Sequence, residues 1–334
     1  YIFPKELEFK TKDEHLSYLQ SYLHENGRSV NVKMYDANWE HNCMLPATSL
    51  NEFIDPCDVL ILEEAEHLLW NQLFRQKLNK AKYILGIIQT NYKARSKNST
   101  DASHLKIRIF MAISPYYHAW ICQRHCDRVI SVSRSIQYAS PIHVAAVNGI
   151  RDSFLQPQTH HHFDKDFYYL GSVAWEKNFK QLIEFCRFCQ VAIDIYGSGT
   201  NYGRGSTMDE IIAYSRQHGN HLNFKGSTPE PHKTVQGYKT YISCSVSEGY
   251  CAANAEAIAM GKFAIIARHP SNEFFYQYDN VLLFDSDREF RQQIQYTLNN
   301  DPVPVPPSQL EELSWKQRTR LLLSKFVPVT ITDR

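Results

Sequence analysis

The sequence predicts an α/β protein with two doubly wound parallel-sheet domains, and three observations support this prediction. The length of 334 residues corresponds to about two domains of ordinary size. Short apolar runs alternate with amphipathic stretches of helical length along most of the chain, which is typical of parallel strands joined by helices. The alternation stops over 151–166, where no hydrophobic period is present, and then starts again.

The first series of elements predicts an N-terminal Rossmann-like domain at 1–150. Its apolar runs predict strands at 29–35, 58–63, 83–89, 127–132 and 142–147. Amphipathic patterns between these runs predict helices that include 66–80 and 103–124. Strands that alternate with helices pair in parallel through right-handed crossovers, so helices are expected on both faces of the sheet.

Residues 151–166 are interpreted as an interdomain linker, because they contain Pro157 and follow no period. This segment also holds three consecutive histidines, His160, His161 and His162. Adjacent residues of an extended chain point in different directions, and a metal ion needs ligands that converge on one point. A solvated linker is therefore favoured over a metal site.

The second series predicts a Rossmann-like domain at 167–306, followed by a C-terminal helix at 307–327. The expected strands are 167–170, 191–196, 221–224, 238–243, 263–267 and 281–284. The expected helices are 178–189, 208–218, 250–260 and 288–298, with a last helical stretch at 308–325. Two such domains would face each other across a cleft, and ligands bind at the carboxyl edge of doubly wound sheets.

The composition excludes several classes of protein. Hydrophobic residues make up 43% and charged residues 21%, as in an ordinary globular protein. The formal net charge is only +1, so no nucleic-acid partner is expected. No run of about 18 apolar residues is present, and we expect a soluble or peripherally bound protein. The pairs Cys186/Cys189 and Cys122/Cys126 are interpreted as free thiols, because neither has a second pair at metal-binding spacing.

The most informative stretch is 243–270, where a predicted strand is followed by a loop of small residues and a helix. The helix is expected to begin near Tyr250 or Cys251. Unpaired backbone N–H groups at a helix N-terminus favour a phosphate. The small residues Gly249 and Ala252 would let that phosphate approach the backbone closely.

Glu248 and Glu256 form a Glu-x7-Glu pattern around the start of this helix. Glu256, inside the helix, could accept hydrogen bonds from paired hydroxyls such as those of a ribose, and Glu248 could do the same for a sugar. An alternative interpretation stays open, in which Glu248 only favours the helix dipole and Glu256 lies on a solvated face. The strand–loop–helix setting favours the nucleotide-sugar interpretation.

A second glycine-containing loop agrees with a nucleotide-sugar site. Gly197 and Gly199 follow the predicted strand at 191–196, and a Gly-x-Gly loop lets a flat ligand lie against the backbone. The pattern is not a dinucleotide fingerprint, because Tyr202 stands where a third glycine would be needed.

The end of the strand at 167–170 supplies the remaining candidates for the donor site. Gly171 and Ser172 end this strand, and Lys177 follows near the start of the next helix. A lysine at that place can reach diphosphate oxygens as a point charge, although alone it would be an ordinary surface residue.

The segment Asp285-Ser286-Asp287 has the Asp-x-Asp pattern that holds a divalent metal in another architecture of sugar-transferring enzymes. Here it precedes a predicted helix, where Asp and Ser are common N-caps. We interpret it as a cap, and we expect neither a metal site nor a cofactor.

These residues resemble the digalactosyldiacylglycerol synthases of plant and algal plastids, which are retaining, glycosyltransferase family 4-like enzymes of the GT-B type. The similarity extends over nearly the whole chain. Its anchors are the sequences AEAIAMGKF at 255–263 and HPSNEFF at 269–275. Further matches lie at 62–68, 90–92, 126–128, 169–171 and 313–315.

The resemblance implies a hexosyltransferase that moves galactose from UDP-galactose to monogalactosyldiacylglycerol and forms digalactosyldiacylglycerol. It also implies that Glu256 holds the ribose, Glu248 the transferred sugar and Lys177 the diphosphate. Retention would follow front-face attack, in which the leaving diphosphate serves as base. The implied location is the plastid envelope, as a peripheral membrane protein.

Three departures from the family pattern bear on this inference. Gln89 stands where the family has a histidine that contacts the transferred sugar, so Gln89 is a candidate catalytic position with an altered side chain. Ser172 replaces a basic residue that helps to neutralise the diphosphate. The first domain is expected to lack its first βα unit, because the family has an earlier strand and a glycine-containing loop.

Two alternatives therefore remain beside galactolipid synthesis. One is a glycosyltransferase that uses another hexose or a non-lipid acceptor, and the other is a non-catalytic UDP-binding relative. A lipid acceptor would require contact with a membrane surface. The expected contact is 68–80, which includes Leu69, Arg75 and Lys77, together with the aromatic and basic residues of 116–124.

Overall fold

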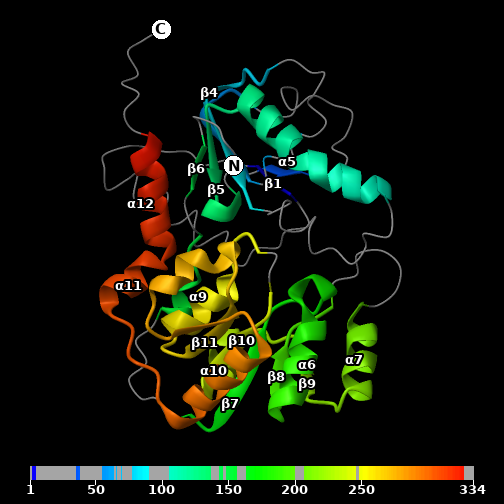
Figure 1. The fold of residues 1–334 in the computed structure, drawn as a ribbon. Helices are drawn as coiled ribbons and strands as arrows, with labels where there is room; N and C mark the ends of the chain where they lie inside the picture. The colour runs from blue at the N-terminus through cyan, green and yellow to red at the C-terminus, as the bar shows by residue number, and fades with distance from the viewer. Residues whose placement is uncertain are drawn as a thin grey trace. The chain divides into compact units, whose positions relative to one another are not determined.

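The structure is a computed structural model. It describes residues 2–4, 35–37, 55–63, 65, 69, 77–89, 105–136, 143–145, 148–155, 163–199, 207–245 and 248–326. The chain divides into two compact units, and Figure 1 shows the elements of each. Unit 1 contains most of the chain up to Asn148 and the last helix, and unit 2 contains Gly149–Ser314.

Unit 1 is built on a six-stranded parallel sheet with the strand order β2-β1-β3-β4-β5-β6. Its strands are β1 (Ile2–Pro4), β2 (Tyr35–Ala37), β3 (Cys57–Glu63), β4 (Ala81–Ile88), β5 (Arg128–Ser131) and β6 (His143–Ala145). Its described helices are α5 (Leu105–His125), the 3₁₀ helix η2 (Arg134–Ile136) and α12 (Trp315–Phe326).

The sequence predicts most of these elements, with two differences. It does not predict β1, which pairs with β2 and β3. The helix expected at 66–80 does not reach its predicted end, because 77–80 have no helical structure. Most of the earlier part of that helix lies outside the described residues, as does 29–34 of the first predicted strand.

Unit 2 is built on a second six-stranded parallel sheet with the order β12-β11-β10-β7-β8-β9. Its strands are β7 (Lys165–Leu170), β8 (Ile193–Tyr196), β9 (Leu222–Gly226), β10 (Tyr238–Ser243), β11 (Phe263–Ala267) and β12 (Val281–Phe284). The first strand, β7, lies between β8 and β10, so the order of the strands reverses beside β7. This topological switch point is where doubly wound sheets bind ligands.

The helices of unit 2 follow its strands in alternation. They are α6 (Phe179–Cys189), α7 (Thr207–Gln217), α8 (Pro231–Thr234), α9 (Ala252–Ala259), α10 (Asp287–Asn299) and α11 (Pro307–Glu312). Three 3₁₀ helices, η3 (Asp152–Phe154), η4 (Trp175–Lys177) and η5 (Pro270–Gln277), lie between them. In α6 the apolar residues Phe179, Leu182 and Cys186 are spaced by three and four, so they share the buried face.

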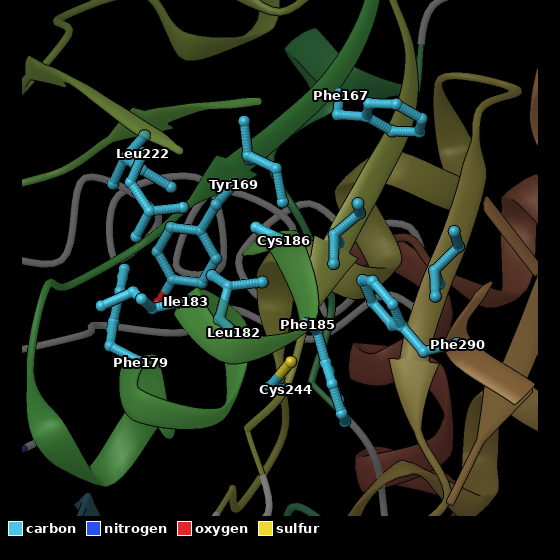
Figure 2. Close-up of a cluster of buried hydrophobic side chains, with 14 of the residues drawn as sticks. Phe167, Tyr169, Phe179, Leu182, Ile183, Phe185, Cys186, Leu222, Cys244 and Phe290 are labelled. Atoms are coloured by element: carbon cyan, nitrogen blue, oxygen red, sulfur yellow. The ribbon is translucent and has the colours of Figure 1, made fainter. Parts of the chain in front are cut away.

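The two faces of this sheet bury separate hydrophobic clusters. Alternate residues of one strand contribute to different clusters, as Ile265 and Ile266 of β11 do. Figure 2 shows the cluster under α6, in which the rings of Phe185 and Phe290 stack at 4.7 Å. The ring of Tyr169 meets that of Phe179 edge to face at 5.0 Å in the same cluster. Both faces of the sheet are therefore covered, as the alternating pattern predicts.

The end of unit 2 corrects one expectation. Residues 307–327, predicted as a single helix, form α11 and α12, with a break at Leu313 and Ser314. The backbone N–H of Ile150 donates to the carbonyl of Leu313 at 2.9 Å, and the hydroxyl of Ser314 donates to the carbonyl of Glu311 at 2.6 Å. These bonds occupy carbonyl groups that a continuous helix would use.

Candidate functional site

The candidate site lies in unit 2, at the carboxyl edge of the sheet beside the switch point. The loops that follow β7, β8 and β10 meet there, because these three strands are neighbours in the sheet. Most of the residues expected to hold the donor belong to these loops or to the helices that they enter. The sheet order alone thus gathers residues that are far apart in the sequence.

The loops after β7 and β8 pack directly against each other. The N–H of Gly171 donates to the carbonyl of Tyr196 at 3.0 Å, and the N–H of Val173 donates to the carbonyl of Ser198 at 2.8 Å. A Cβ atom at Gly197 would lie 1.7 Å from the carbonyl oxygen of Gly171, so only glycine fits. This contact gives the edge a surface of backbone atoms, as expected for Gly171 and Gly197.

Ser172 lies at the same edge. Its carbonyl accepts a hydrogen bond from the hydroxyl of Tyr169 at 2.9 Å, which fixes the backbone directly after β7. The side chain carries no charge, so Lys177 is the cation that the sequence places in this loop. Lys177 ends η4, and Asn178 follows with a left-handed backbone (φ 60°) before α6 begins.

Lys177 and Glu248 form an ion pair, which the sequence analysis does not predict. The Nζ atom of Lys177 lies 2.6 Å from Oε1 of Glu248, and the two side chains are only 21% and 12% exposed. The side-chain amide of Asn178 also donates to the carbonyl of Cys244 at 3.3 Å. Both contacts join the start of α6 to the segment after β10, so the two predicted charges occupy one site.

The segment from Gly249 to Ala252 leads into α9. Cys251 is the N-cap residue of this helix, and its side chain accepts no capping hydrogen bond. The first turn of α9 contains no acidic residue, so its N–H groups retain the partial positive charge that favours an anion. Burial raises the pKa of the Cys251 thiol to about 12, so this side chain is a neutral thiol.

Glu256 lies in α9 and is buried, with 8% of its surface exposed. Burial raises the pKa of its carboxyl to about 7, because water no longer solvates the charged form. Arg151 opposes this effect, since its Nη2 lies 3.5 Å from Oε1 of Glu256. The burial contradicts the alternative in which Glu256 lies on a solvated face.

Sequence reasoning missed Arg151. It stands directly before η3, and it is separated from Glu256 by 105 positions, so no local spacing connects the two residues. A charged residue beside the predicted domain boundary was the only available signal.

Residues 269–275 contact α9 and the segment that leads into it. The amide nitrogen of Asn254 in α9 donates to Oδ1 of Asn272 at 3.1 Å, and the amide of Asn272 donates to the carbonyl of Ala267 at 2.8 Å. The ring of Phe275, which is fully buried, lies 5.5 Å from that of Tyr250. This anchor segment thereby fixes the position of α9 relative to β11.

The remaining candidate residues belong to other elements of the chain. Gln89 follows β4 in unit 1. Asp285 pairs with Arg268 at 2.8 Å, and Ser286 accepts a hydrogen bond from the N–H of Glu289, which confirms the N-cap interpretation. Within the described parts of the chain, no group of three or more His, Cys, Asp or Glu side chains is placed to hold a metal ion.

The four cysteines of the two pairs form no disulfide bond. Cys122, Cys126 and Cys186 are buried, and Cys189 is half-buried. The described helices contain no segment long and apolar enough to cross a bilayer.

Comparisons with known proteins identify relatives of this chain. Residues 151–310 match the family model described as "Glycosyl transferases group 1". This match begins at Arg151 and covers nearly all of unit 2. It contains every candidate residue except Gln89.

Relatives with similar sequences extend over the whole chain. The chain is 28% identical to digalactosyldiacylglycerol synthase 1 of Glycine max, with 100% of this chain and 43% of that protein covered. Its identity to digalactosyldiacylglycerol synthase 2 of Arabidopsis thaliana is 25%, with 100% and 72% covered. The chain thus spans about two-fifths of the length of the synthase 1 proteins that it matches.

Solved structures share the fold. A glycosyltransferase from Rickettsia africae aligns with a TM-score of 0.64 at 12% identity, covering 99% of this chain and 98% of that chain. The Anabaena protein HepE, solved in complex with UDP, aligns with a TM-score of 0.63 at 11% identity, covering 92% and 88%. The predicted fold class, two Rossmann-like domains of the GT-B type, is thereby confirmed. Residues 151–310 thus form a domain of the group 1 glycosyltransferases, and the chain as a whole is related in sequence to the digalactosyldiacylglycerol synthases.

Proposed function

We propose that this protein is a retaining galactosyltransferase that converts monogalactosyldiacylglycerol into digalactosyldiacylglycerol with UDP-galactose as donor. The single observation that carries the proposal is the buried ion pair of Lys177 and Glu248 at the carboxyl edge of unit 2, which joins the start of α6 to the loop that leads into α9, the helix that carries Glu256. The relatives named digalactosyldiacylglycerol synthases support the choice of substrates.

The donor binds with its charges distributed over this edge. Glu256 accepts hydrogen bonds from the ribose hydroxyls, and the diphosphate lies between Lys177 and the N-terminal turn of α9. The backbone surface of Gly171, Ser172 and Gly197 lets the nucleotide approach closely. Glu248 orients the galactose through its hydroxyls once Lys177 has turned to the phosphate.

The chemical step exchanges one bond at the anomeric carbon for another on the same face. The acceptor hydroxyl oxygen bonds to the anomeric carbon while the bond from that carbon to the β-phosphate oxygen breaks. The electron pair stays on the phosphate oxygen, which also takes the proton of the hydroxyl. Lys177 and the N–H groups of α9 stabilise the charge that develops on the leaving UDP.

The acceptor is a membrane lipid, so the proposal includes a peripheral membrane contact at the plastid envelope. In α5 of unit 1, Tyr116 is 79% exposed and Trp120 is 45% exposed, and the guanidinium of Arg124 lies 5.8 Å from the Trp120 ring. Aromatic residues next to a basic one suit the headgroup region. Leu69 corrects our expectation, because it is fully buried and cannot contact a membrane.

Incubation of the purified protein with UDP-galactose and vesicles of monogalactosyldiacylglycerol tests the proposal, with products identified by mass. Parallel reactions contain UDP-glucose, UDP-N-acetylglucosamine and soluble galactosides. A digalactosyl lipid with an α-linkage is expected. A product with another sugar or a non-lipid acceptor would replace the substrates of the proposal, and UDP binding without any product would indicate a non-catalytic relative.

Sedimentation with anionic vesicles tests the membrane contact separately. Trp120→Ala combined with Arg124→Glu should reduce the bound fraction, because each basic residue near an anionic surface contributes about 1 kcal/mol. Tyr296→Ala is the control, since Tyr296 is a similarly exposed aromatic residue of unit 2, at 48%. Equal binding by both variants would remove α5 from the membrane contact.

A further inference from the structure

Two contacts hold the guanidinium of Arg151 in place. Its Nη2 lies 3.5 Å from Oε1 of Glu256, and its central carbon lies 4.9 Å from the centre of the Phe154 ring. Phe154 is fully buried and belongs to the core of unit 2. The backbone of Arg151 is extended and leads directly into η3. The arginine is therefore oriented by the core and directed at the carboxylate.

Glu256 depends on this partner for its charge. Its carboxylate is buried, and a buried carboxylate without a charged partner takes up a proton instead of remaining ionised. In the described part of the chain, two titratable groups interact electrostatically with Glu256. Arg151 favours the ionised form, and Tyr168 of β7 faces it as a neutral hydroxyl, since burial holds the pKa of Tyr168 well above its usual value.

The contact with Arg151 leaves Oε2 of Glu256 available to a ligand. Arg151 contacts Oε1, and no protein hydrogen bond to Oε2 is recorded among the described residues. An ionised carboxylate can accept several hydrogen bonds, so Oε2 and the remaining lone pair of Oε1 can serve paired hydroxyls. A protonated carboxyl would keep fewer acceptor positions and no charge.

We propose that Arg151 is a positioning residue, which keeps Glu256 ionised and aimed at the ribose hydroxyls and so sets the pH range over which the donor binds. This inference rests on the proposed function, in which Glu256 holds the ribose. Arg151 itself need not touch the donor. It acts through Glu256, and its removal has a distinctive effect on the pH dependence of binding.

The direction of that effect follows from the charge on Glu256. Donor binding requires the ionised carboxylate, so affinity is lost as the pH falls through the pKa of Glu256, which is about 7 with Arg151 in place. Without Arg151 the same carboxylate is protonated at higher pH, so the loss of affinity begins at higher pH. A merely structural role for Arg151 would lower affinity equally at every pH.

Calorimetric titration with UDP-galactose between about pH 6 and about pH 8.5 tests the inference. UDP-galactose is the probe because its diphosphate, unlike the terminal phosphate of UDP, does not titrate in this range. For a shift of one pKa unit, Arg151→Met should lose about fivefold in affinity at pH 7 and nearly tenfold near pH 6, and it should regain most of the affinity at the alkaline end. Arg151→Lys should lie between Arg151→Met and the wild type, because it restores the charge without the guanidinium.

Two further variants serve as controls. Arg187→Met removes an arginine whose partner, Glu184, lies 2.9 Å away on the exposed side of α6, and it should keep the wild-type profile. Glu256→Gln should bind weakly with little pH dependence. Arg151→Met should add no further loss in the Glu256→Gln background, because both changes act on one carboxylate.

The outcomes separate this inference from the proposed function. Wild-type affinity in Glu256→Gln would overturn the role of Glu256 in donor binding, and with it the inference. A weak Glu256→Gln variant beside an Arg151→Met variant with an unshifted profile would overturn the inference alone. A uniform loss at every pH in Arg151→Met would do the same. Circular dichroism checks that each variant is folded, and the profile of Arg151→Lys decides the case if Arg151→Met is not.

Discussion

Two lysine–glutamate ion pairs of unit 2 have the same length and different surroundings. Lys177–Glu248 and Lys233–Glu230 each place Nζ 2.6 Å from Oε1. The side chains of the second pair are 64% and 54% exposed, and water screens their charges. The first pair has lost most of its water at the edge of the sheet. The short distance is common to both pairs, whereas burial distinguishes Lys177–Glu248 from Lys233–Glu230.

The origin of the two pairs differs in the same way. Lys233 and Glu230 are three positions apart at α8, so local structure alone brings them together. Lys177 and Glu248 are separated by 71 positions and meet because β7 and β10 are neighbours in the sheet. In the absence of a donor, each residue of this pair neutralises the other. Under the proposed function, the diphosphate of the donor would become the partner of Lys177, and the sugar hydroxyls would become the partners of Glu248.

The largest expected effect is on turnover. Glu248→Ala should lower the rate with UDP-galactose by about 10²–10³-fold, because it removes a charge that orients the sugar in the transition state. Affinity for UDP should fall far less, since UDP lacks the hydroxyls that Glu248 would hold. Steady-state rates and calorimetry measure the two effects.

Glu230→Ala is the matched control and should keep the wild-type rate. Equal losses of affinity for UDP and UDP-galactose in Glu248→Ala would contradict a role at the sugar. That result would leave Glu248 with an effect on α9 alone.

A smaller effect is expected from the other half of the pair. Lys177→Met should weaken UDP binding by about ten- to 150-fold, the value of a charge-assisted hydrogen bond of about 1.5–3 kcal/mol. Calorimetry of Lys177→Met beside Lys233→Met measures this difference. The assignment fails if both variants bind UDP with the wild-type affinity.

Lys262 extends the comparison to a buried lysine without a recorded carboxylate partner in the described part of the chain. Its Nζ donates to the carbonyls of Gln236 and Tyr238, and burial lowers its pKa to about 7. Between about pH 7 and about pH 10.5 the unfolded chain holds a proton that the folded chain lacks, so stability should rise with pH over this window.

Lys262→Met should remove up to about 1.4 kcal/mol of this rise per pH unit. Urea unfolding at two pH values within the window measures the slope, with Lys233→Met as control. Identical slopes in wild type and Lys262→Met would show that Lys262 stays charged in the folded protein.

No effect is expected from chelation. Activity should survive EDTA, because Lys177 and the N-terminus of α9 supply the counter-charge for the leaving diphosphate. Product formation is measured with and without EDTA, and then with added manganese. Loss of activity with recovery in manganese would overturn this expectation and would bring Asp285 and Asp287 back as candidate ligands.

The sequence predicts most of unit 2 because its strands are short apolar runs with polar boundaries. The predicted bounds of β10, β11 and β12 agree with the structure. Elements that depend on distant partners were missed or misjudged. β1 has only three residues and forms by pairing with β2 and β3, and the break between α11 and α12 depends on a hydrogen bond from Ile150.

The candidate site shows the same limit. The spacing of Glu248 and Glu256 marks two residues around a helix start, and the structure places them there. Spacing cannot reveal the partners Lys177 and Arg151, which come from other strands and loops. Burial of Glu256 likewise depends on tertiary packing, so its raised pKa could not be foreseen from the pattern of residues.

The hydrogen bond between Ile150 and Leu313 joins the two ends of unit 2. The chain enters unit 2 at Gly149 and leaves it after Ser314, and Ile150 and Ser314 are paired in a parallel β-bridge. Unit 2 is thus inserted into unit 1, and its two ends lie together. Domains with adjacent termini tolerate insertion into another chain and circular permutation. A module carrying Lys177, Arg151 and both glutamates could be exchanged between proteins as one continuous piece.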